Sequence, residues 1–126
     1  MDNDQLKKIN YALIDTFLIA GDRSIELRRI GLKKEIKSDN TPVTNGDIEV
    51  NKILTEKIKN ITSDIPIVSE ESTTNKSNNN LNNFWLIDPI DGTHDYINNK
   101  DEFTLNAGLI INKKPKLGII YAPAKK

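Results

Sequence analysis

The sequence predicts an α+β fold in which two long helices pack on a largely antiparallel sheet. Two amphipathic helical segments come first in the chain of 126 residues, and short apolar segments with strand character follow them. The last two of these segments are separated by only a short polar stretch, as the strands of a hairpin are. Helices that precede a run of neighbouring strands are typical of α+β domains and not of alternating α/β folds.

The first helix is expected over residues 4–29, because apolar side chains recur there at spacings of three and four residues. Such a stripe faces the core of a domain. An acidic or amide side chain at residues 2–4 can cap the start of this helix, and Gly31 is a suitable stop. The apolar stripe consists of Leu6, Ile9, Leu13, Phe17 and Ala20.

The second helix is expected over residues 44–61. Thr44 is a good N-cap, and Asp47 follows three residues later, which makes a variant of the capping box. The buried face of this helix is predicted to consist of Val50, Ile53, Leu54, Ile58 and Ile61.

The rest of the chain contains the strands and one long polar segment. Residues 72–83 are rich in asparagine, and we expect a mobile surface loop there. Alternating apolar residues in the segment that follows Glu102 indicate a half-buried strand, and residues 112–115 suit a hairpin turn. The strands are expected at residues 67–69, 84–88, 103–111 and 116–122.

Composition excludes several classes of site. Eighteen basic and eighteen acidic residues cancel, so the chain lacks the electrostatic footprint of a nucleic-acid-binding protein. There is no cysteine and only one histidine, His94, so a metal site must use oxygen ligands, which suits magnesium. We read no signal peptide at the N-terminus and no apolar run of about 20 residues that would span a bilayer. A cytoplasmic location is therefore expected.

The segment Asp-Pro-Ile-Asp-Gly-Thr at residues 88–93 carries the most chemical information. It follows an apolar strand, and Pro89 restrains the backbone, so Asp88 and Asp91 are expected to point into one site from a tight turn. Gly92 permits close backbone approach, and a helical turn that starts here would direct free N–H groups at a phosphate. Neighbouring carboxylates repel each other, so the pair is expected to need divalent cations.

Two other acidic segments lie upstream, and each has an ordinary interpretation when taken alone. Asp47 can be only a helix cap, Glu70 and Glu71 can be solvated surface, and the Asp-Gly-Thr segment can be only a turn. Glu70 and Glu71 also follow a short apolar strand, and strand ends deliver side chains rigidly to a sheet edge. The three acidic segments together, in this order, indicate a metal site.

At these segments the chain resembles the inositol monophosphatase superfamily. Residues 88–93 resemble the superfamily motif Asp-Pro-x-Asp-Gly-Thr, residues 70–71 its Glu-Glu motif, and residues 42–47 its Pro-Val-Thr-x-x-Asp motif. The resemblance extends from the first helix to Pro123. The branch that the chain resembles most is the 3′(2′),5′-bisphosphate nucleotidases, called CysQ in bacteria. This similarity lies in residues 37–44, 101–106 and 118–123.

The resemblance implies a magnesium site. Glu70, Asp88 and the carbonyl oxygen of Ile90 would bind the first ion, and Asp88 would bridge to a second ion that Asp91 also holds. The complete family site takes two or three magnesium ions, accepts manganese and is inhibited by lithium. The implied fold is the N-terminal half of the layered αβαβα sugar-phosphatase fold.

The resemblance also implies catalytic roles. Gly92 and Thr93 would bind the substrate phosphate through backbone N–H groups, while Thr93 and Asp47 would orient and deprotonate the attacking water. Glu70 would contribute to catalysis through the magnesium ion that it binds. Auxiliary roles near the site would fall to Glu71 and Lys37.

The chain departs from the family in length. Family members are considerably longer, and their second half supplies a further metal-binding aspartate in a Trp-Asp motif together with most of the substrate pocket. Trp85 is the only tryptophan here, so we expect residues 1–126 to form a single N-terminal metal-binding phosphatase domain, with the C-terminal domain absent. The sequence leaves open whether the chain is a fragment or naturally short.

Three functions follow as expectations. The first is a magnesium-dependent phosphomonoesterase that hydrolyses 3′-phosphoadenosine 5′-phosphate to AMP and phosphate, incompletely in this short chain. The second is inositol monophosphatase-like activity, and the third is a non-catalytic fragment that only binds metal or self-associates. The expected partner is a small phosphorylated substrate, with no nucleic acid, and residues 116–122 offer a sheet edge for self-association.

Overall fold

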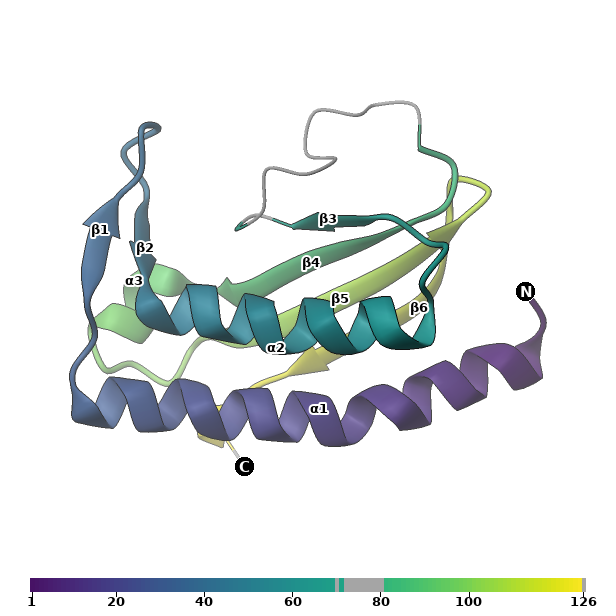
Figure 1. Cartoon of the computed structure of the whole chain (residues 1–126). Helices are drawn as coiled ribbons and strands as arrows, with labels where there is room; N and C mark the ends of the chain where they lie inside the picture. Colours follow the sequence, from purple (N-terminus) through teal and green to yellow (C-terminus); the bar gives the residue numbers. More distant parts are fainter. Residues whose placement is uncertain (70, 72–80, 126) are drawn as a thin grey trace.

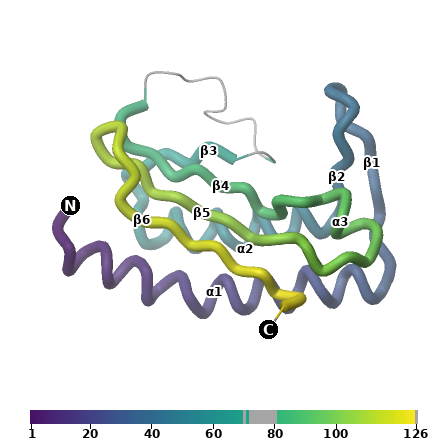
Figure 2. Tube along the Cα trace, turned by 180° about the vertical axis from the view of Figure 1, so that it is seen from behind, coloured from purple at the N-terminus to yellow at the C-terminus, as the bar shows by residue number. Residues whose placement is uncertain are grey.

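The computed structural model describes residues 1–69, 71 and 81–125. Two long helices, α1 (Asn3–Ile30) and α2 (Asn45–Ile61), come first in the chain. They run side by side in opposite directions along one face of a sheet, with α1 packed on α2 and toward β6, and α2 packed on β4 (Figure 1). The view from behind shows the sheet in front of both helices (Figure 2). The expected α+β arrangement is therefore confirmed.

Local interactions explain where the helices begin and end. The Asp2 carboxylate accepts a hydrogen bond from the backbone N–H of Gln5 at 2.8 Å, and the Gln5 side chain accepts one from the backbone N–H of Asp2. Gly31 ends α1 with a φ of 122°, a conformation that glycine tolerates best. Thr44 and Asp47 form the predicted capping box of α2.

The main sheet of the described residues has the order β3-β4-β5-β6. β3 pairs with β4 in parallel, whereas the β4–β5 and β5–β6 pairs are antiparallel, so the predicted largely antiparallel sheet is confirmed. Apolar side chains on the helix-facing side alternate along β5, as the sequence predicted. The strands are β3 (Ile67–Ser69), β4 (Phe84–Asp91), β5 (Thr104–Ile111) and β6 (Lys114–Tyr121).

The turn between β5 and β6 is shorter than the segment 112–115 predicted for it. Asn112 and Lys113 form the turn with φ of 53° and 64°, the left-handed conformation that two-residue hairpin turns require. Pro115 lies inside β6 instead of in the turn. Proline is tolerated there because β6 is an edge strand of the described sheet.

A second hairpin, which the sequence did not predict, projects from the helix ends (Figure 1). It consists of β1 (Lys34–Ile36) and β2 (Pro42–Thr44), paired antiparallel. Each strand has three residues, and the first is wholly exposed, so no apolar alternation marks it in the sequence. The hairpin leads directly into the Thr44 cap of α2 and places its own turn beside the site described below.

The core lies between the two helices and the sheet. Trp85 is completely buried, and its indole N–H donates to the hydroxyl of Thr62 just beyond α2 at 3.0 Å. On the opposite side of the sheet, Leu86 and Ile120 remain exposed. None of the helices in the described part of the chain combines the length and apolarity needed to cross a bilayer. The largest apolar contributors to the core are Leu13, Phe17, Val50, Leu54, Ile58, Ile87, Phe103, Leu105 and Leu109.

Two expectations fall on residues that the structure leaves undescribed. The loop predicted at residues 72–83 lies outside the described residues over positions 72–80. Glu70, the predicted ligand of the first magnesium, is also outside them. Both remain predictions.

Candidate active site

Asp47 and Thr93 meet, although 46 residues separate them in the sequence. Asp47 is 1% exposed at the start of α2. Its Oδ2 atom accepts hydrogen bonds from the backbone N–H of Thr44 at 2.9 Å and from the Thr44 hydroxyl at 2.6 Å. Its Oδ1 atom accepts the hydroxyl of Thr93 at 2.9 Å. Asp47 is therefore a helix cap, and one of its two oxygen atoms also holds Thr93.

Thr93 begins a short helix, α3 (Thr93–Ile97), at the end of β4. The Thr93 hydroxyl also lies 3.1 Å from the carbonyl oxygen of Ile90, so two acceptors compete for its single proton. Gly92 precedes the helix in the left-handed conformation, with φ 87° and ψ 39°. The expected helical turn after the Asp-Pro-Ile-Asp-Gly-Thr motif is present.

Asp88 and Asp91 belong to a strand and not to the tight turn that the sequence suggested. β4 continues through Asp91. Within it, Asp88 pairs with Asn106 of β5, and Asp91 pairs with Thr104 of β5. Three steps along β4 therefore match two steps along β5, which is one extra residue, or a β-bulge. In a regular strand, residues three apart point to opposite faces. The bulge removes this alternation and allows both carboxylates to serve the same pocket.

That pocket has a volume of about 240 Å³. It brings together most of the predicted site residues from the β1–β2 hairpin, the segment after β3, the end of β4 and the start of α3. Asp47 lies behind it and reaches it through Thr93. The lining also includes Asp39, Thr41, Pro42 and His94, which sequence reasoning did not assign to the site. The predicted residues in the lining are Lys37, Glu71, Asp88, Ile90, Asp91, Gly92 and Thr93.

Three of the four additional residues come from the hairpin, whose turn was not recognised in the sequence, and His94 comes from α3. Asp39 accepts hydrogen bonds from the Thr41 hydroxyl at 2.5 Å and from the Thr41 backbone N–H at 3.1 Å. These hydrogen bonds, with a smaller contribution from Lys37, lower the pKa of Asp39 below its usual value. Asp39 is consequently anionic at neutral pH. A recognisable signal for this turn was the Ser-Asp-Asn-Thr-Pro segment, a composition typical of turns.

The described lining is predominantly acidic. Asp39, Glu71, Asp88 and Asp91 contribute carboxylates, and Lys37 contributes one ammonium group. Lys37 Nζ lies 3.5 Å from Oε1 of Glu71, whose side chain is only 10% exposed. Such a site repels a phosphate unless cations first neutralise the carboxylates.

The oxygen donors of the pocket suit the magnesium ion that the resemblance implies. Carboxylate and carbonyl oxygen atoms dominate the described lining, and hard cations prefer such ligands. Within the described residues no three acidic or histidine side chains already stand close enough to hold a metal ion. Glu70, the proposed third carboxylate, lies outside these residues. The chemistry of the donors thus fits magnesium.

Comparison with known proteins decides the family. The model of the inositol monophosphatase family matches residues 2–126. This chain belongs to the inositol monophosphatase family. Among curated relatives, the 3′(2′),5′-bisphosphate nucleotidase CysQ of Haemophilus influenzae is 42% identical over 91 residues, which cover 71% of this chain and 34% of that protein. The CysQ of Buchnera aphidicola is 44% identical over 88 residues, covering 69% of this chain and 33% of the relative.

Solved structures of inositol monophosphatase family members share the fold. The CysQ of Bacteroides thetaiotaomicron is 32% identical, with a TM-score of 0.66 over 92% of this chain and 42% of that chain. A structure described as an IMPase/NADP phosphatase complexed with NADP and Ca²⁺ has a TM-score of 0.84 at 20% identity, over 96% of this chain and 46% of that chain. The matches to the curated relatives span about a third of those proteins' length.

Gly92 offers a first test of the site in this inositol monophosphatase family member. A Cβ atom there would lie 2.9 Å from the backbone oxygen of Glu102, and φ is positive. We expect Gly92→Ala to destabilise the fold by about 1–3 kcal/mol, measured by urea unfolding. Gly118→Ala is the matched control, because a Cβ at Gly118 meets no atom within 4 Å. Equal stability of the two variants would contradict the strain assigned to Gly92.

Proposed function

We propose that this chain supplies the metal- and phosphate-binding part of a magnesium-dependent phosphomonoesterase that hydrolyses 3′-phosphoadenosine 5′-phosphate to AMP and phosphate. The observation that carries the proposal is the hydrogen bond from Thr93, which lines a carboxylate-rich pocket, to Asp47 behind it. Support for the substrate comes from the CysQ relatives, which are named as 3′(2′),5′-bisphosphate nucleotidases.

The proposed metal ligands are Asp88, Asp91 and the carbonyl oxygen of Ile90, all at the bulged end of β4, together with Glu70. The bulge supports this assignment, because it lets two carboxylates from one strand serve one pocket. Bound magnesium ions lower the pKa of a coordinated water and stabilise the charge that develops during phosphoryl transfer. Manganese as a replacement and inhibition by lithium belong to the same proposal.

The protein groups have separate tasks in this proposal. The Thr93 hydroxyl donates its proton to Asp47, so its oxygen lone pairs are left to accept a hydrogen bond from the attacking water. As the water reacts, it gives a proton to the Thr93 oxygen while the Thr93 hydroxyl gives its own proton to Oδ1 of Asp47, so Asp47 holds the proton removed. The backbone N–H groups of Gly92 and Thr93 bind the substrate phosphate. Lys37 balances the charge of Glu71 across 3.5 Å at the pocket wall.

A parallel assay tests the substrate. Phosphate release is measured with magnesium on 3′-phosphoadenosine 5′-phosphate and on inositol 1-phosphate, using the protein as its native cells produce it. We expect the nucleotide to be hydrolysed with the higher kcat/KM. A preference for inositol 1-phosphate would replace the nucleotidase proposal by the inositol monophosphatase alternative, and no hydrolysis of either substrate would overturn both.

The polypeptide of residues 1–126 alone is expected to show little or no phosphatase activity and to self-associate. The described site contains no Trp-Asp aspartate, and β6, which contains the exposed Ile120, is an edge strand of the described sheet. An apolar edge strand is a template for pairing with another chain. Light scattering and phosphate release on the purified polypeptide test this expectation. A monodisperse monomer with turnover of about 1–10³ s⁻¹ would contradict it.

A further inference from the structure

We propose that Tyr96 is a positioning residue that sets the approach of Thr93 to Asp47. The inference rests on the proposed function, because it assigns to Tyr96 the task of holding the two groups that are proposed to orient the attacking water. Tyr96 is not among the residues that line the pocket, and it acts through the helix α3 that carries Thr93.

A helix as short as α3 depends on tertiary contacts for its position. It has five residues, and a single helical turn is not stable on its own in water. Tyr96 is the one buried residue of α3, and its side chain is 0% exposed. The contacts of this ring therefore decide where Thr93, one turn earlier in the same helix, is held.

The first contact joins α3 to α1. The Tyr96 hydroxyl donates a hydrogen bond of 2.6 Å to the carbonyl oxygen of Ser24, which lies 72 residues earlier in the chain. Burial, and next the negative charge of Asp47, raise the pKa of Tyr96. The hydroxyl consequently remains protonated, and it remains a donor, throughout the physiological pH range.

The second contact joins α3 to the first turn of α2. A Cβ atom at Gly46 would lie 2.3 Å from the Tyr96 hydroxyl oxygen and 2.8 and 2.9 Å from two ring carbons. Only glycine leaves enough room for the ring at this position. Gly46 directly precedes Asp47, so the ring of Tyr96 limits how closely α3 approaches the carboxylate that accepts the Thr93 hydroxyl.

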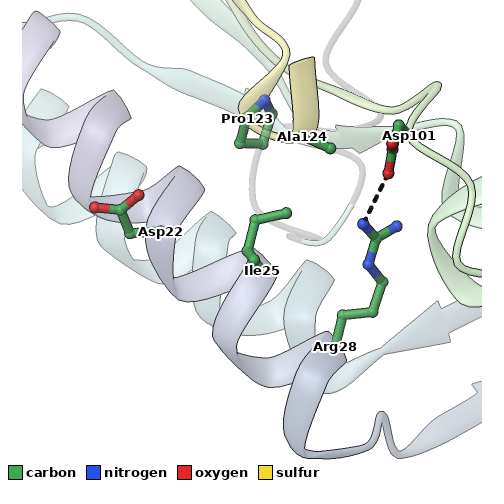
Figure 3. A pocket seen from close by; sticks show the side chains of 6 residues that line it. All are labelled: Asp22, Ile25, Arg28, Asp101, Pro123 and Ala124. Atoms are coloured by element: carbon green, nitrogen blue, oxygen red, sulfur yellow. Dashed lines mark hydrogen bonds and ion pairs between the residues drawn. The ribbon is translucent and has the colours of Figure 1, made fainter. Parts of the chain in front are cut away.

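The remaining side of the ring is also closed. The Phe103 ring packs against Tyr96 with centroids 4.7 Å apart, and the Arg28 guanidinium lies 5.6 Å from the Tyr96 centroid and 5.0 Å from the Phe103 centroid. Arg28 itself is held by the Lys100 carbonyl oxygen at 2.7 Å and by Asp101 at 3.3 Å. Figure 3 shows the Arg28–Asp101 pair beside a pocket of about 420 Å³.

Together these contacts couple the position of the Tyr96 ring to the position of Thr93. The ring of Tyr96 cannot move toward Phe103 or Gly46 without collision, and its hydroxyl is anchored on α1. Since Thr93 and Tyr96 share one helical turn, a change at the ring is transmitted to the Thr93–Asp47 hydrogen bond. A displacement of about 1 Å at a catalytic group can lower turnover by about 10²-fold.

The test compares Tyr96→Phe with Tyr121→Phe. Each variant loses one tyrosine hydroxyl, and the hydroxyl of Tyr121 is buried without a hydrogen-bond partner among the described residues. We expect Tyr96→Phe to lower kcat about three- to tenfold with KM changed less than about twofold. Tyr121→Phe should change neither parameter. Equal kcat values for the two variants would show that Tyr96 serves only core packing.

A double substitution tests whether the contact between Tyr96 and position 46 affects kcat. Alanine favours a helix more than glycine does, so a decrease in kcat in Gly46→Ala is attributed to the collision of the new Cβ atom with Tyr96. We expect Gly46→Ala to lower kcat by about tenfold or more. Adding Tyr96→Phe removes the 2.3 Å contact and should recover part of that loss. A double variant less active than Gly46→Ala would overturn the inference.

A measurement without turnover separates this inference from the proposed function. The hydroxyl proton of Thr93 is followed by NMR in the same protein and variants that are used for the kcat measurements, where exchange with water reports its hydrogen bond to Asp47. We expect slow exchange in the natural sequence and in Tyr121→Phe, faster exchange in Tyr96→Phe, and partial restoration in the double variant relative to Gly46→Ala. If the protein hydrolyses neither phosphate ester but these exchange rates follow this order, the proposed function fails and the positioning role stands. Unchanged exchange in Tyr96→Phe would refute the positioning role whatever the activity.

Discussion

Replacing Asp88 with asparagine is expected to abolish specific magnesium binding. Asp88 lies at the bulge of β4, which allows its carboxylate to serve the same pocket as that of Asp91. Residues that only support metal ligands typically contribute about 10–100-fold to affinity, so loss of a proposed bridging ligand should exceed that range. Isothermal titration calorimetry with magnesium measures the effect.

The control for Asp88→Asn removes the same charge elsewhere. Asp64 is exposed in the turn after α2 and does not line the 240 Å³ pocket. Asp64→Asn should therefore bind magnesium as the natural sequence does. If the calorimetric titration of Asp88→Asn matched that of Asp64→Asn, the proposed metal site would be wrong.

Replacing Thr93 with alanine or Asp47 with asparagine is expected to lower turnover by about 10²–10⁴-fold, the range typical of general base catalysis. Thr93 donates to Oδ1 of Asp47, and both groups are proposed to orient the attacking water. The measurement is kcat with 3′-phosphoadenosine 5′-phosphate and magnesium, on the protein as its native cells produce it.

Stability measurements separate catalysis from capping in these variants. Oδ2 of Asp47 accepts two hydrogen bonds from Thr44, so Asp47→Asn should also destabilise the fold by about 1 kcal/mol. Thr93→Ala leaves this cap intact and should lose turnover with little loss of stability. Thr55→Ala is the control, because the Thr55 hydroxyl donates to carbonyl oxygen atoms of Asn51 and Lys52 within α2. If both Thr93→Ala and Asp47→Asn retained the turnover of Thr55→Ala, the proposed catalytic role of Asp47 and Thr93 would be wrong, and Asp47 would serve only to cap α2 and hold Thr93.

Interactions between near neighbours in the sequence made much of the fold predictable. The spacing of Leu13 and Phe17 predicted the buried face of α1, and Thr44 with Asp47 predicted the cap of α2. A cap joins residues three positions apart, and an apolar stripe repeats within one or two turns. Such patterns are visible in the sequence without knowledge of any partner element.

The candidate site was predictable in composition but not in geometry. The residues pointed to an oxygen-ligand site for a divalent cation, and the family resemblance assigned roles to Asp47 and Thr93. The contribution of Asp39 and Thr41 was missed, because the short β1–β2 hairpin has no apolar alternation. The prediction for Glu70 stays a prediction, since that residue lies outside the described part of the chain.

The sequence alone thus determined the two helices, their caps, the strands of the sheet and the acidic motif at the end of β4. The sequence also predicted that Asp88 and Asp91 serve one site, but only the tertiary structure decided that a bulged strand and not a tight turn brings them there, because a bulge exists only relative to the register of β5. The tertiary structure likewise decided that Tyr96 lies between Gly46 and Ser24, since that contact depends on how α1, α2 and α3 pack together. Local patterns reflect interactions within a few residues, whereas register and packing depend on partners far away in the chain.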